Sequence, residues 1–263
     1  MIPTDVYPAV VPFLTCGWPT PDGFLASVEG LAEAGCPYFE VGFPFSDPVA
    51  DGPTIQLSSS EALDAGVDLE ACFRLTKQAT EKSGLPAVAM TYANLVFYLG
   101  VDEFCKRLKA CGGEGLIVPD LSFEESAPVK EACEKHRLEL VSFLAPTTAS
   151  ARREKIAKVA QGFLYLVAVR GVTGGASSAG PELNQLIRDA KEHASCPVLV
   201  GFGVKSPEQV SDILKSGADG AIVGSALLEA VRSSPQDVLA IRETVSRFLS
   251  PLVAATERTH SSL

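Results

Sequence analysis

The stretch "LKSGADGAIVG", residues 214–224, joins the end of an amphipathic helical pattern to a short apolar strand through glycines. Gly217 suits the position after a helix, because glycine readily takes the left-handed backbone conformation needed there. The same order of helix end, glycine and strand occurs in "AEAGCPYFEVG" (32–42) and "KACGGEGLIVP" (109–119). Three such copies indicate a chain built from repeated helix and strand units.

Short apolar runs alternate with longer helical patterns along all 263 residues. Strands that are apolar on both faces are typical of parallel sheets covered by helices. We therefore predict one α/β domain, residues 1–263, folded as a single (β/α)₈ TIM barrel with a frayed polar tail at 256–263. An open doubly wound sheet is the alternative, but "TCGWPTPDG" (15–23) lacks the G-x-G-x-x-G turn expected after its first strand. The predicted strands are Val10–Leu14, Tyr38–Gly42, Ala87–Thr91, Gly115–Val118, Glu139–Phe143, Phe163–Val167, Val198–Gly201 and Ala221–Val223.

Composition excludes several classes of partner. The net charge of −10 and the pI near 4.9 disfavour nucleic acid and anionic membranes, although a small anion could still bind a locally positive pocket. Seven cysteines without a C-x-x-C pair predict buried free thiols in a reducing compartment. The start "MIPTDVYPAV" lacks the features of an export signal, and no run reaches about 18 apolar residues. We expect a cytoplasmic protein.

Histidine and lysine are poorly placed for catalysis in such a barrel, whose site lies at the carboxyl ends of the strands. His136, His193 and His260 fall at predicted helix ends or in the tail. Lys205 follows the seventh strand, and no lysine lies within a predicted strand. We therefore expect neither a histidine metal site or catalytic triad nor a shielded imine-forming lysine.

Carboxylates remain, and "EVGFPFSDPVADGPTIQ" (40–56) holds three of them. Glu40 falls inside the second strand, where a buried acid is costly unless it is paired or protonated. The first basic residue in the chain is Arg74, so a local salt bridge is not available and a functional role is favoured. We expect Phe43 and Phe45 to desolvate Glu40 and raise its pKa, as suits a general acid.

The roles of the other carboxylates stay open at this point. Asp51, in "ADGP", is equally consistent with a turn and with a place in the site. Asp47, in "SDP", favours a turn. Asp120 could cap the next turn or line the site.

Glycine clusters follow three consecutive strands. They are "GVTGG" (171–175), "GFG" (201–203) and "GSA" (224–226), and the last opens a helix. Backbone N–H groups approach an anion closely where no Cβ intrudes, and a helix N-terminus favours negative charge. These clusters predict a phosphorylated small-molecule substrate.

Seven motifs together resemble the tryptophan synthase α chain, in order and in spacing, from about Val10 to Ala255. They are "PFLTCGWP", "FEVGFPFSDPVADGPTIQ", "MTYANLVFYLG", "GLIVPDLSFEES", "GVTGG", "VGFGV" and "ADGAIVGSA". The resemblance implies a lyase that cleaves indole-3-glycerol phosphate to indole and glyceraldehyde 3-phosphate, a retro-aldol step of tryptophan biosynthesis, without metal or organic cofactor. It also implies a β chain partner that carries pyridoxal phosphate, in an α₂β₂ heterotetramer with a tunnel for indole.

The resemblance also assigns residues. Glu40 is similar to the general acid/base, and Asp51 to the carboxylate that accepts a hydrogen bond from the indole N–H. The substrate-binding residues it implies are Phe13, Tyr92, Ile117, Tyr165, Phe202 and, in a loop whose threonine contacts the catalytic aspartate on closure, Thr173. The implied phosphate-binding residues are Gly174, Gly203, Gly224 and Ser225, and the implied partner-facing residues are Pro44, Asp47 and Pro48.

Two departures and three rival functions accompany the resemblance. The family usually has a helix before the first strand, whereas only about nine residues precede that strand in this chain, and Arg170 stands directly before the glycine of a segment often written Ser-Arg-x-Gly. The rivals are a stand-alone lyase that releases free indole, a non-catalytic subunit that only activates its partner, and a sugar-phosphate isomerase. Retention of both Glu40 and Asp51 disfavours the second, and the lack of a strand-end histidine or lysine disfavours the third.

Overall fold

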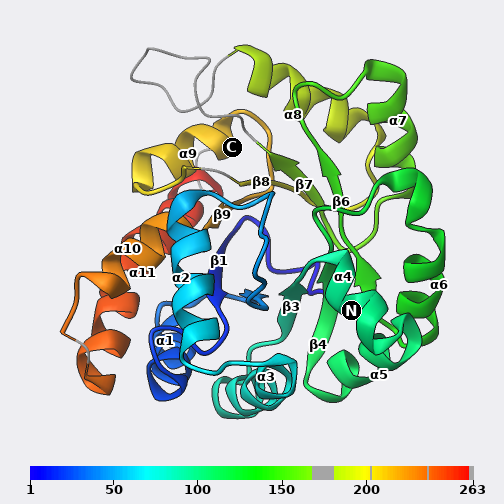
Figure 1. Ribbon diagram of the computed structural model, residues 1–263. Helices are drawn as coiled ribbons and strands as arrows, with labels where there is room; N and C mark the ends of the chain where they lie inside the picture. Colours follow the sequence, from blue (N-terminus) through cyan, green and yellow to red (C-terminus); the bar gives the residue numbers. More distant parts are fainter. Residues whose placement is uncertain (168–180, 202, 236, 261–263) are drawn as a thin grey trace.

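A barrel of nine parallel strands forms the centre of the molecule (Figure 1). The computed structural model describes residues 1–167, 181–201, 203–235 and 237–260. The strands are hydrogen-bonded in the order β5-β4-β3-β2-β1-β9-β8-β7-β6, so the first and last strands of the chain meet and close the wall. This confirms the predicted (β/α)₈ fold. The strands are β1 Ala9–Thr15, β2 Phe39–Gly42, β3 Ala87–Met90, β4 Gly113–Ile117, β5 Glu139–Leu140, β6 Ser142–Leu144, β7 Leu164–Val167, β8 Val198–Gly201 and β9 Gly220–Val223.

One predicted strand is divided in two. The segment 139–143 appears as β5, which pairs with β4, and β6, which pairs with β7. Val141 lies between them and still donates its N–H to the Leu116 carbonyl, at 3.0 Å. The fifth strand of the barrel therefore pairs with β4 before Val141 and with β7 after it. No ladder joins β4 to β6 in the described residues.

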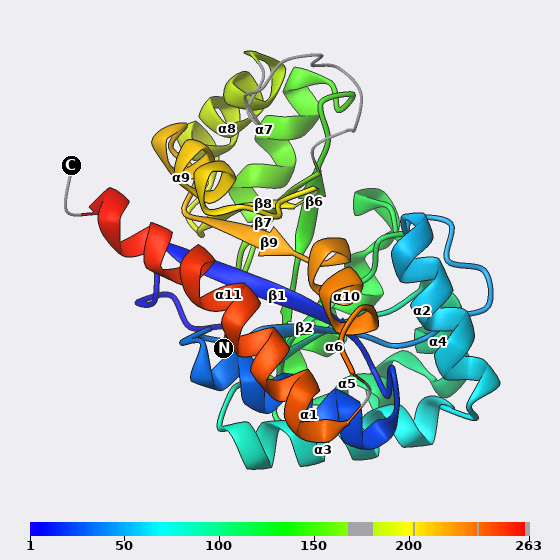
Figure 2. The ribbon, with the colours of Figure 1, turned by 90° about the vertical axis from the view of Figure 1, so that its left-hand side faces the viewer.

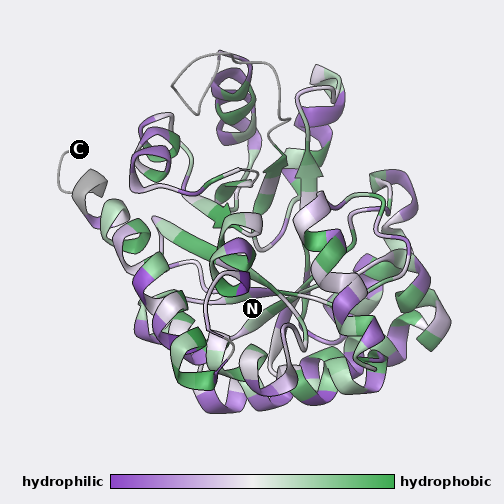
Figure 3. Ribbon diagram, turned by 60° about the vertical axis from the view of Figure 1, so that its left-hand side comes forward, coloured by the Kyte–Doolittle hydropathy of each residue, from purple (hydrophilic) through white to green (hydrophobic). Residues whose placement is uncertain are grey.

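Helices surround the barrel, as the alternating pattern predicts, and the strands they cover are mostly apolar (Figure 3). No helix in the described ranges is long and apolar enough to cross a membrane. The helices are α1 Pro21–Glu33, α2 Pro53–Asp64, α3 Leu69–Ser83, α4 Ala93–Leu99, α5 Val101–Ala110, the 3₁₀ turn η1 Phe123–Glu125, α6 Ala127–Lys135, α7 Ser150–Val159, α8 Pro181–His193, α9 Pro207–Lys215, α10 Ser225–Arg232 and α11 Val238–His260.

The ends of α9 follow from local chemistry. Ser206 accepts a hydrogen bond from the Gln209 N–H, and Pro207 occupies the first turn, where its missing N–H has no cost. Gly217, in the stretch quoted first, has φ +97° and turns the chain back toward β9. The predicted turn at Gly217 is confirmed.

The last helix, α11, packs along α1 and α9 on the outside of the barrel (Figure 2). Arg242 of α11 pairs with Glu29 and Glu33 of α1. The helix extends to His260 and buries Thr256, at the start of the segment 256–263 for which the sequence predicts a frayed tail. Residues 261–263 lie outside the described residues.

The amino-terminal segment covers the bottom of the barrel without forming a helix. Ile2 is buried and packs in the barrel interior, and its N–H donates to Glu139 at 2.7 Å. Gly115 and Gly162 make room for the Ile2 side chain, since a Cβ at either would lie 2.7 Å from it. This segment occupies the place where the family resemblance implies a preceding helix.

Candidate active site

The interior face of β1 and β2 brings the first two predicted site residues together. Phe13 is the register partner of Glu40, and both side chains project into the barrel near the carboxyl ends of their strands. The Phe13 ring lies against Gly42, where a Cβ would come within 2.4 Å of its Cζ. Glycine at the end of β2 therefore allows the ring to lie over the strand that carries the acid.

Glu40 is fully buried, and neither of its carboxyl oxygens has a hydrogen-bond partner within the described ranges. Burial alone raises the pKa of Glu40 to about 8, because removal from water disfavours the charged form. A carboxyl group that keeps its proton at neutral pH can serve as a general acid. The predicted burial and raised pKa are confirmed.

The source of that burial differs from the expectation. Phe43 points outward and packs edge-on against Phe73 of α3, with ring centroids 5.4 Å apart. Phe45 stacks on Tyr92, with centroids 5.1 Å apart. Phe43 therefore does not shield Glu40, because successive side chains of a strand point to opposite faces. The barrel interior itself desolvates the acid.

Asp51 lies in the loop between β2 and α2, half-buried at the barrel mouth. Its carboxylate accepts a hydrogen bond from the Tyr92 hydroxyl at 3.0 Å, and Gln56 of α2 donates to its backbone carbonyl at 2.9 Å. Burial raises the pKa of Asp51 to about 6, and the Tyr92 hydrogen bond pulls in the opposite direction. Asp51 is thus ionised at neutral pH while Glu40 is protonated.

Tyr165 of β7 brings the two acids into one site. Burial is the main cause that raises the pKa of Tyr165, and the charges of Glu40 and Asp51 raise it further, so both carboxyl groups lie in the neighbourhood of this phenol. Gly201 on β8 leaves the space for this side chain, since a Cβ there would lie 2.3 Å from the Tyr165 hydroxyl oxygen. Ile117, at the end of β4, is fully buried in the same interior cluster.

Sequence reasoning missed Phe143 of β6. Its ring packs against Tyr165, with centroids 5.0 Å apart and planes tilted by 38°. The position is two residues after Val141 on the inward face, so strand alternation could have identified it once the fifth strand was placed. Phe143 also lines a cavity of about 500 Å³ at the break between β4 and β6.

The predicted anion cradle is described in part. Gly203 follows β8 with φ +75° and open space around its Cα. Gly224 precedes α10 and lies beside Phe13, 3.5 Å from whose Cβ a Cβ at Gly224 would lie, and Ser225 is the first residue of that helix, where the first N–H groups have no intrahelical partners. Three further predicted residues, Thr173, Gly174 and Phe202, lie outside the described residues, as does Arg170.

Asp120 has a capping role, which the sequence left open. Its carboxylate accepts from the Ala93 N–H at 2.9 Å and so caps the first turn of α4. In the predicted partner-facing loop, Asp47 is exposed and Pro48 is half-buried, but Pro44 is buried against the barrel. Val49, in the same loop, is 81% exposed.

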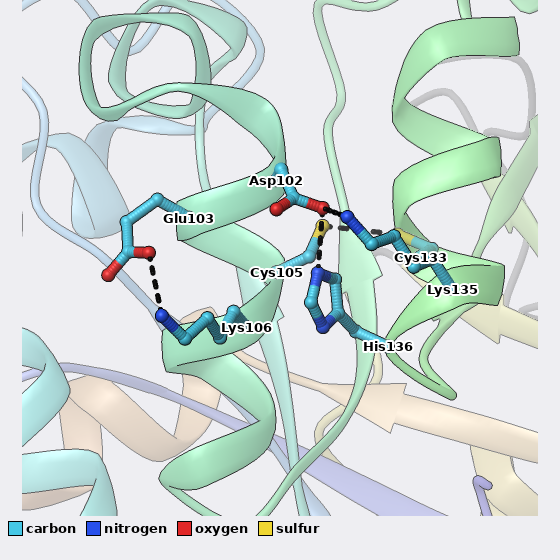
Figure 4. Close-up of polar contacts among 7 residues, drawn as sticks. All are labelled: Asp102, Glu103, Cys105, Lys106, Cys133, Lys135 and His136. Carbon is cyan, nitrogen blue, oxygen red and sulfur yellow. Dashed lines mark hydrogen bonds and ion pairs between the residues drawn. The ribbon is translucent and has the colours of Figure 1, made fainter.

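Histidine lies away from this site, as predicted. His136 follows α6 and contacts Asp102 of α5 at 2.8 Å, beside Lys135 (Figure 4). Lys205 is exposed, and across the residues the structure describes there is no cluster of histidine, cysteine and carboxylate groups suited to a metal ion. All seven cysteines are free, and six are buried.

The arrangement offers one protonated acid and one carboxylate at the mouth of an apolar barrel. Phe13, Ile117, Phe143 and Tyr165 make the walls apolar and aromatic, and the helix N-terminus of α10 lies near the same mouth. Such a site can bind a flat aromatic group with an anionic tail and can donate a proton to it while stabilising positive charge on it.

Comparison with known proteins gives one consistent result. Residues 4–256 match the family model described as tryptophan synthase alpha chain. The tryptophan synthase alpha chain of Methanothermobacter thermautotrophicus is 39% identical over 247 residues, which is 94% of this chain and 92% of that protein. That of Geobacillus kaustophilus is 43% identical over 225 residues, covering 85% of this chain and 83% of the relative.

Solved structures agree with the sequence comparisons. A structure of the tryptophan synthase α₂β₂ complex from Pyrococcus furiosus contains a chain with a TM-score of 0.87 and 34% identity, covering 94% of this chain and 98% of that one. A chain of tryptophan synthase from M. tuberculosis gives a TM-score of 0.82 at 33% identity, covering 94% and 92%.

Proposed function

This chain belongs to the tryptophan synthase alpha chain family, and from that premise we propose that it cleaves indole-3-glycerol phosphate to indole and glyceraldehyde 3-phosphate. The observation that carries the proposal is a pair of carboxyl groups in contrasting environments: Glu40 is fully buried with no hydrogen-bond partner among the described residues, and Asp51 is held by the Tyr92 hydroxyl, which gives their pKa values opposite places around neutrality. Environments that shift the pKa values of two acids apart in this way are typical of general acid–base catalysis.

Glu40 acts as the general acid and then as the base. Its carboxyl group donates a proton to C3 of the indole ring, and the ring thereby becomes a cation. The resulting Glu40 carboxylate removes the proton of the glycerol hydroxyl next to the ring. The carbon–carbon bond then breaks, its electrons return to the ring, the new carbonyl belongs to glyceraldehyde 3-phosphate, and Glu40 ends protonated as it began.

Asp51 stabilises the cationic ring. Its carboxylate accepts a hydrogen bond from the indole N–H, whose positive charge grows as C3 is protonated. The protonated ring is then the electron sink for bond cleavage, and the two carboxyl groups account for the proton transfers and the charge stabilisation. Phe13, Ile117 and Tyr165 hold the ring by apolar contact.

The phosphate group is bound by the segments after β8 and β9. Gly203 and Gly224 permit close approach of the backbone, and the N-terminal N–H groups of α10, beginning with Ser225, point toward the anion. We assign Thr173, Gly174 and Phe202 to the same substrate site on the family pattern alone.

The partner is a β chain in an α₂β₂ assembly, like the complex described for Pyrococcus furiosus. We assign the loop that carries Asp47, Pro48 and Val49 to the partner contact on the family pattern, and the exposure of Asp47 and Val49 is compatible with that assignment. We assign pyridoxal phosphate to that partner and propose that the α chain needs no cofactor of its own.

We further propose that the chain is cytoplasmic and forms one domain.

The direct test is indole formation by the purified chain from indole-3-glycerol phosphate, with and without a β chain of the family. We expect slow cleavage alone, faster cleavage with the β chain, and an increase in mass on size-exclusion chromatography. A chain that cleaves at full rate and never associates is a stand-alone lyase. A chain whose turnover is unchanged by Glu40→Gln does not use Glu40 as its general acid and base.

A further inference from the structure

Tyr92 stands at the junction between the barrel and the loop that carries Asp51. It lies two residues after the end of β3 and is the N-cap residue of α4, whose first turn is held by Asp120. The side chain is 3% exposed, so its ring and hydroxyl are fixed by their surroundings.

The Tyr92 side chain contacts this loop at three points. Its ring stacks on Phe45, with planes inclined by 23°. Its hydroxyl oxygen accepts from the Ala50 N–H at 3.0 Å and its O–H donates to the Asp51 carboxylate at 3.0 Å. Within the described residues, Tyr92 is the side chain that donates to this carboxylate. One phenol therefore connects the backbone of the loop, its aromatic side chain and its acid.

We infer that Tyr92 is a positioning residue, whose hydroxyl holds Asp51 ionised and oriented toward the indole N–H, apart from any contact between its ring and the substrate. The inference rests on the proposed function and deepens it. The family resemblance assigns Tyr92 an apolar contact with the ring; the geometry gives its hydroxyl a separate task. A hydrogen bond to the ionised form of a carboxyl group favours that form.

Few charged groups affect the pKa values of Asp51 and Tyr92. The charges of Glu40 and Asp51 both raise the pKa of Tyr165 of β7, so these three groups lie in one neighbourhood of the barrel. Asp120, after β4, acts on Tyr92 as a further negative charge. In the part of the chain that the structure describes, no cation contributes to the pKa of Asp51, so the Tyr92 hydrogen bond is the contribution that opposes burial.

Tyr92→Phe tests the inference, because it removes the hydroxyl and keeps the ring that stacks on Phe45. We expect kcat for indole formation by the full chain to fall roughly tenfold with little change in KM, since the lost interaction acts in the transition state. The acid limb of the pH profile should move to higher pH by about 0.5 pH unit or more, because Asp51 becomes harder to ionise.

Tyr98→Phe is the matched control, since it removes an exposed hydroxyl from the same helix, α4. It should leave kcat and the pH profile of the isolated chain unchanged. Placing p-aminophenylalanine at position 92 restores a donor and should recover much of the rate, which a merely structural effect of the substitution would not predict. Circular dichroism checks that each variant is folded.

The possible outcomes distinguish a failure of this inference from a failure of the proposed function on which it rests. If the wild-type chain forms no indole, the proposed function fails. If the wild type is active and Tyr92→Phe keeps its rate and its acid limb, the function stands and the role of Tyr92 is refuted. If the rate falls but the acid limb stays and the amino analogue gives no recovery, Tyr92 acts through packing alone and the inference is also refuted.

Discussion

Phe13 on β1 is the register partner of Glu40 on β2, and its ring lies across the end of the strand that carries the acid. The contact is possible because residue 42 is glycine, with no Cβ to meet the ring. The apolar wall of the site and its proton donor are therefore fixed relative to each other by the barrel wall.

Gly42→Ala should disturb this arrangement. The new Cβ would lie 2.4 Å from Phe13 Cζ, so the ring must move, and we expect a loss of about 1–3 kcal/mol in the free energy of unfolding, together with slower cleavage. Urea unfolding followed by the fluorescence of Trp18, the single tryptophan, measures the first effect. The double variant Phe13→Leu with Gly42→Ala should recover part of the stability, because leucine leaves room for the methyl group. Full stability of the single variant would contradict the contact.

Glu40→Gln should abolish cleavage and stabilise the protein. General acid–base groups contribute about 10² to 10⁴ in rate, so turnover should fall at least a hundredfold. The carboxyl group ionises near its ordinary pKa of 4.5 when unfolded and near about 8 when folded. The contribution of protonated Glu40 to the free energy of unfolding is therefore complete below about pH 4.5, and it is lost as the pH rises toward 8.

The glutamine variant does not titrate at this position. It should exceed the wild type by about 2 kcal/mol or more at pH 8, with a much smaller difference near pH 5. Unfolding curves at the two pH values measure this. An equal difference at both would mean that Glu40 does not hold a proton in the folded protein.

Cleavage should show a bell-shaped dependence on pH. Activity requires ionised Asp51, whose pKa is about 6, and protonated Glu40, whose pKa is about 8. The rate should thus rise through about pH 6 and fall through about pH 8 when kcat/KM is measured across the range. Glu40→Asp, if active, should shift the basic limb and leave the acid limb in place. A profile that is flat between pH 5 and pH 9 would refute both assignments.

Ser225→Asp should weaken substrate binding through the phosphate. A carboxylate at the first position of α10 competes with the anion for the same N–H groups and repels it. KM should rise by roughly tenfold or more with a smaller effect on kcat, and inorganic phosphate should inhibit the variant less than the wild type. Ser233→Asp, at the opposite end of the same helix, provides the control, and equal KM values for the two variants would count against the cradle.

The sequence was informative where local chemistry determines structure. Glycine after a helix, proline in its first turn and apolar strands predict the barrel, and an acid in a strand far from any cation singles out Glu40. It was less informative where distant segments meet. The outward packing of Phe43 on Phe73, the place of Phe143 beside Tyr165 and the hydrogen bond from Tyr92 to Asp51 all depend on how neighbouring strands and loops are arranged in space.

The division of the fifth strand at Val141 also has a consequence for local opening of the molecule. The ladder of hydrogen bonds runs from β5 to β6 around the barrel, and these two ends are joined by the covalent chain rather than by a further ladder. A cavity lies at this junction and is lined by Val118, Val141 and Ser142. Segments with fewer backbone hydrogen bonds open at lower free energy than the whole domain. Amide hydrogen exchange should therefore be faster around residues 141–144 than in β1 or β2, which makes this junction a place where the barrel wall can open locally.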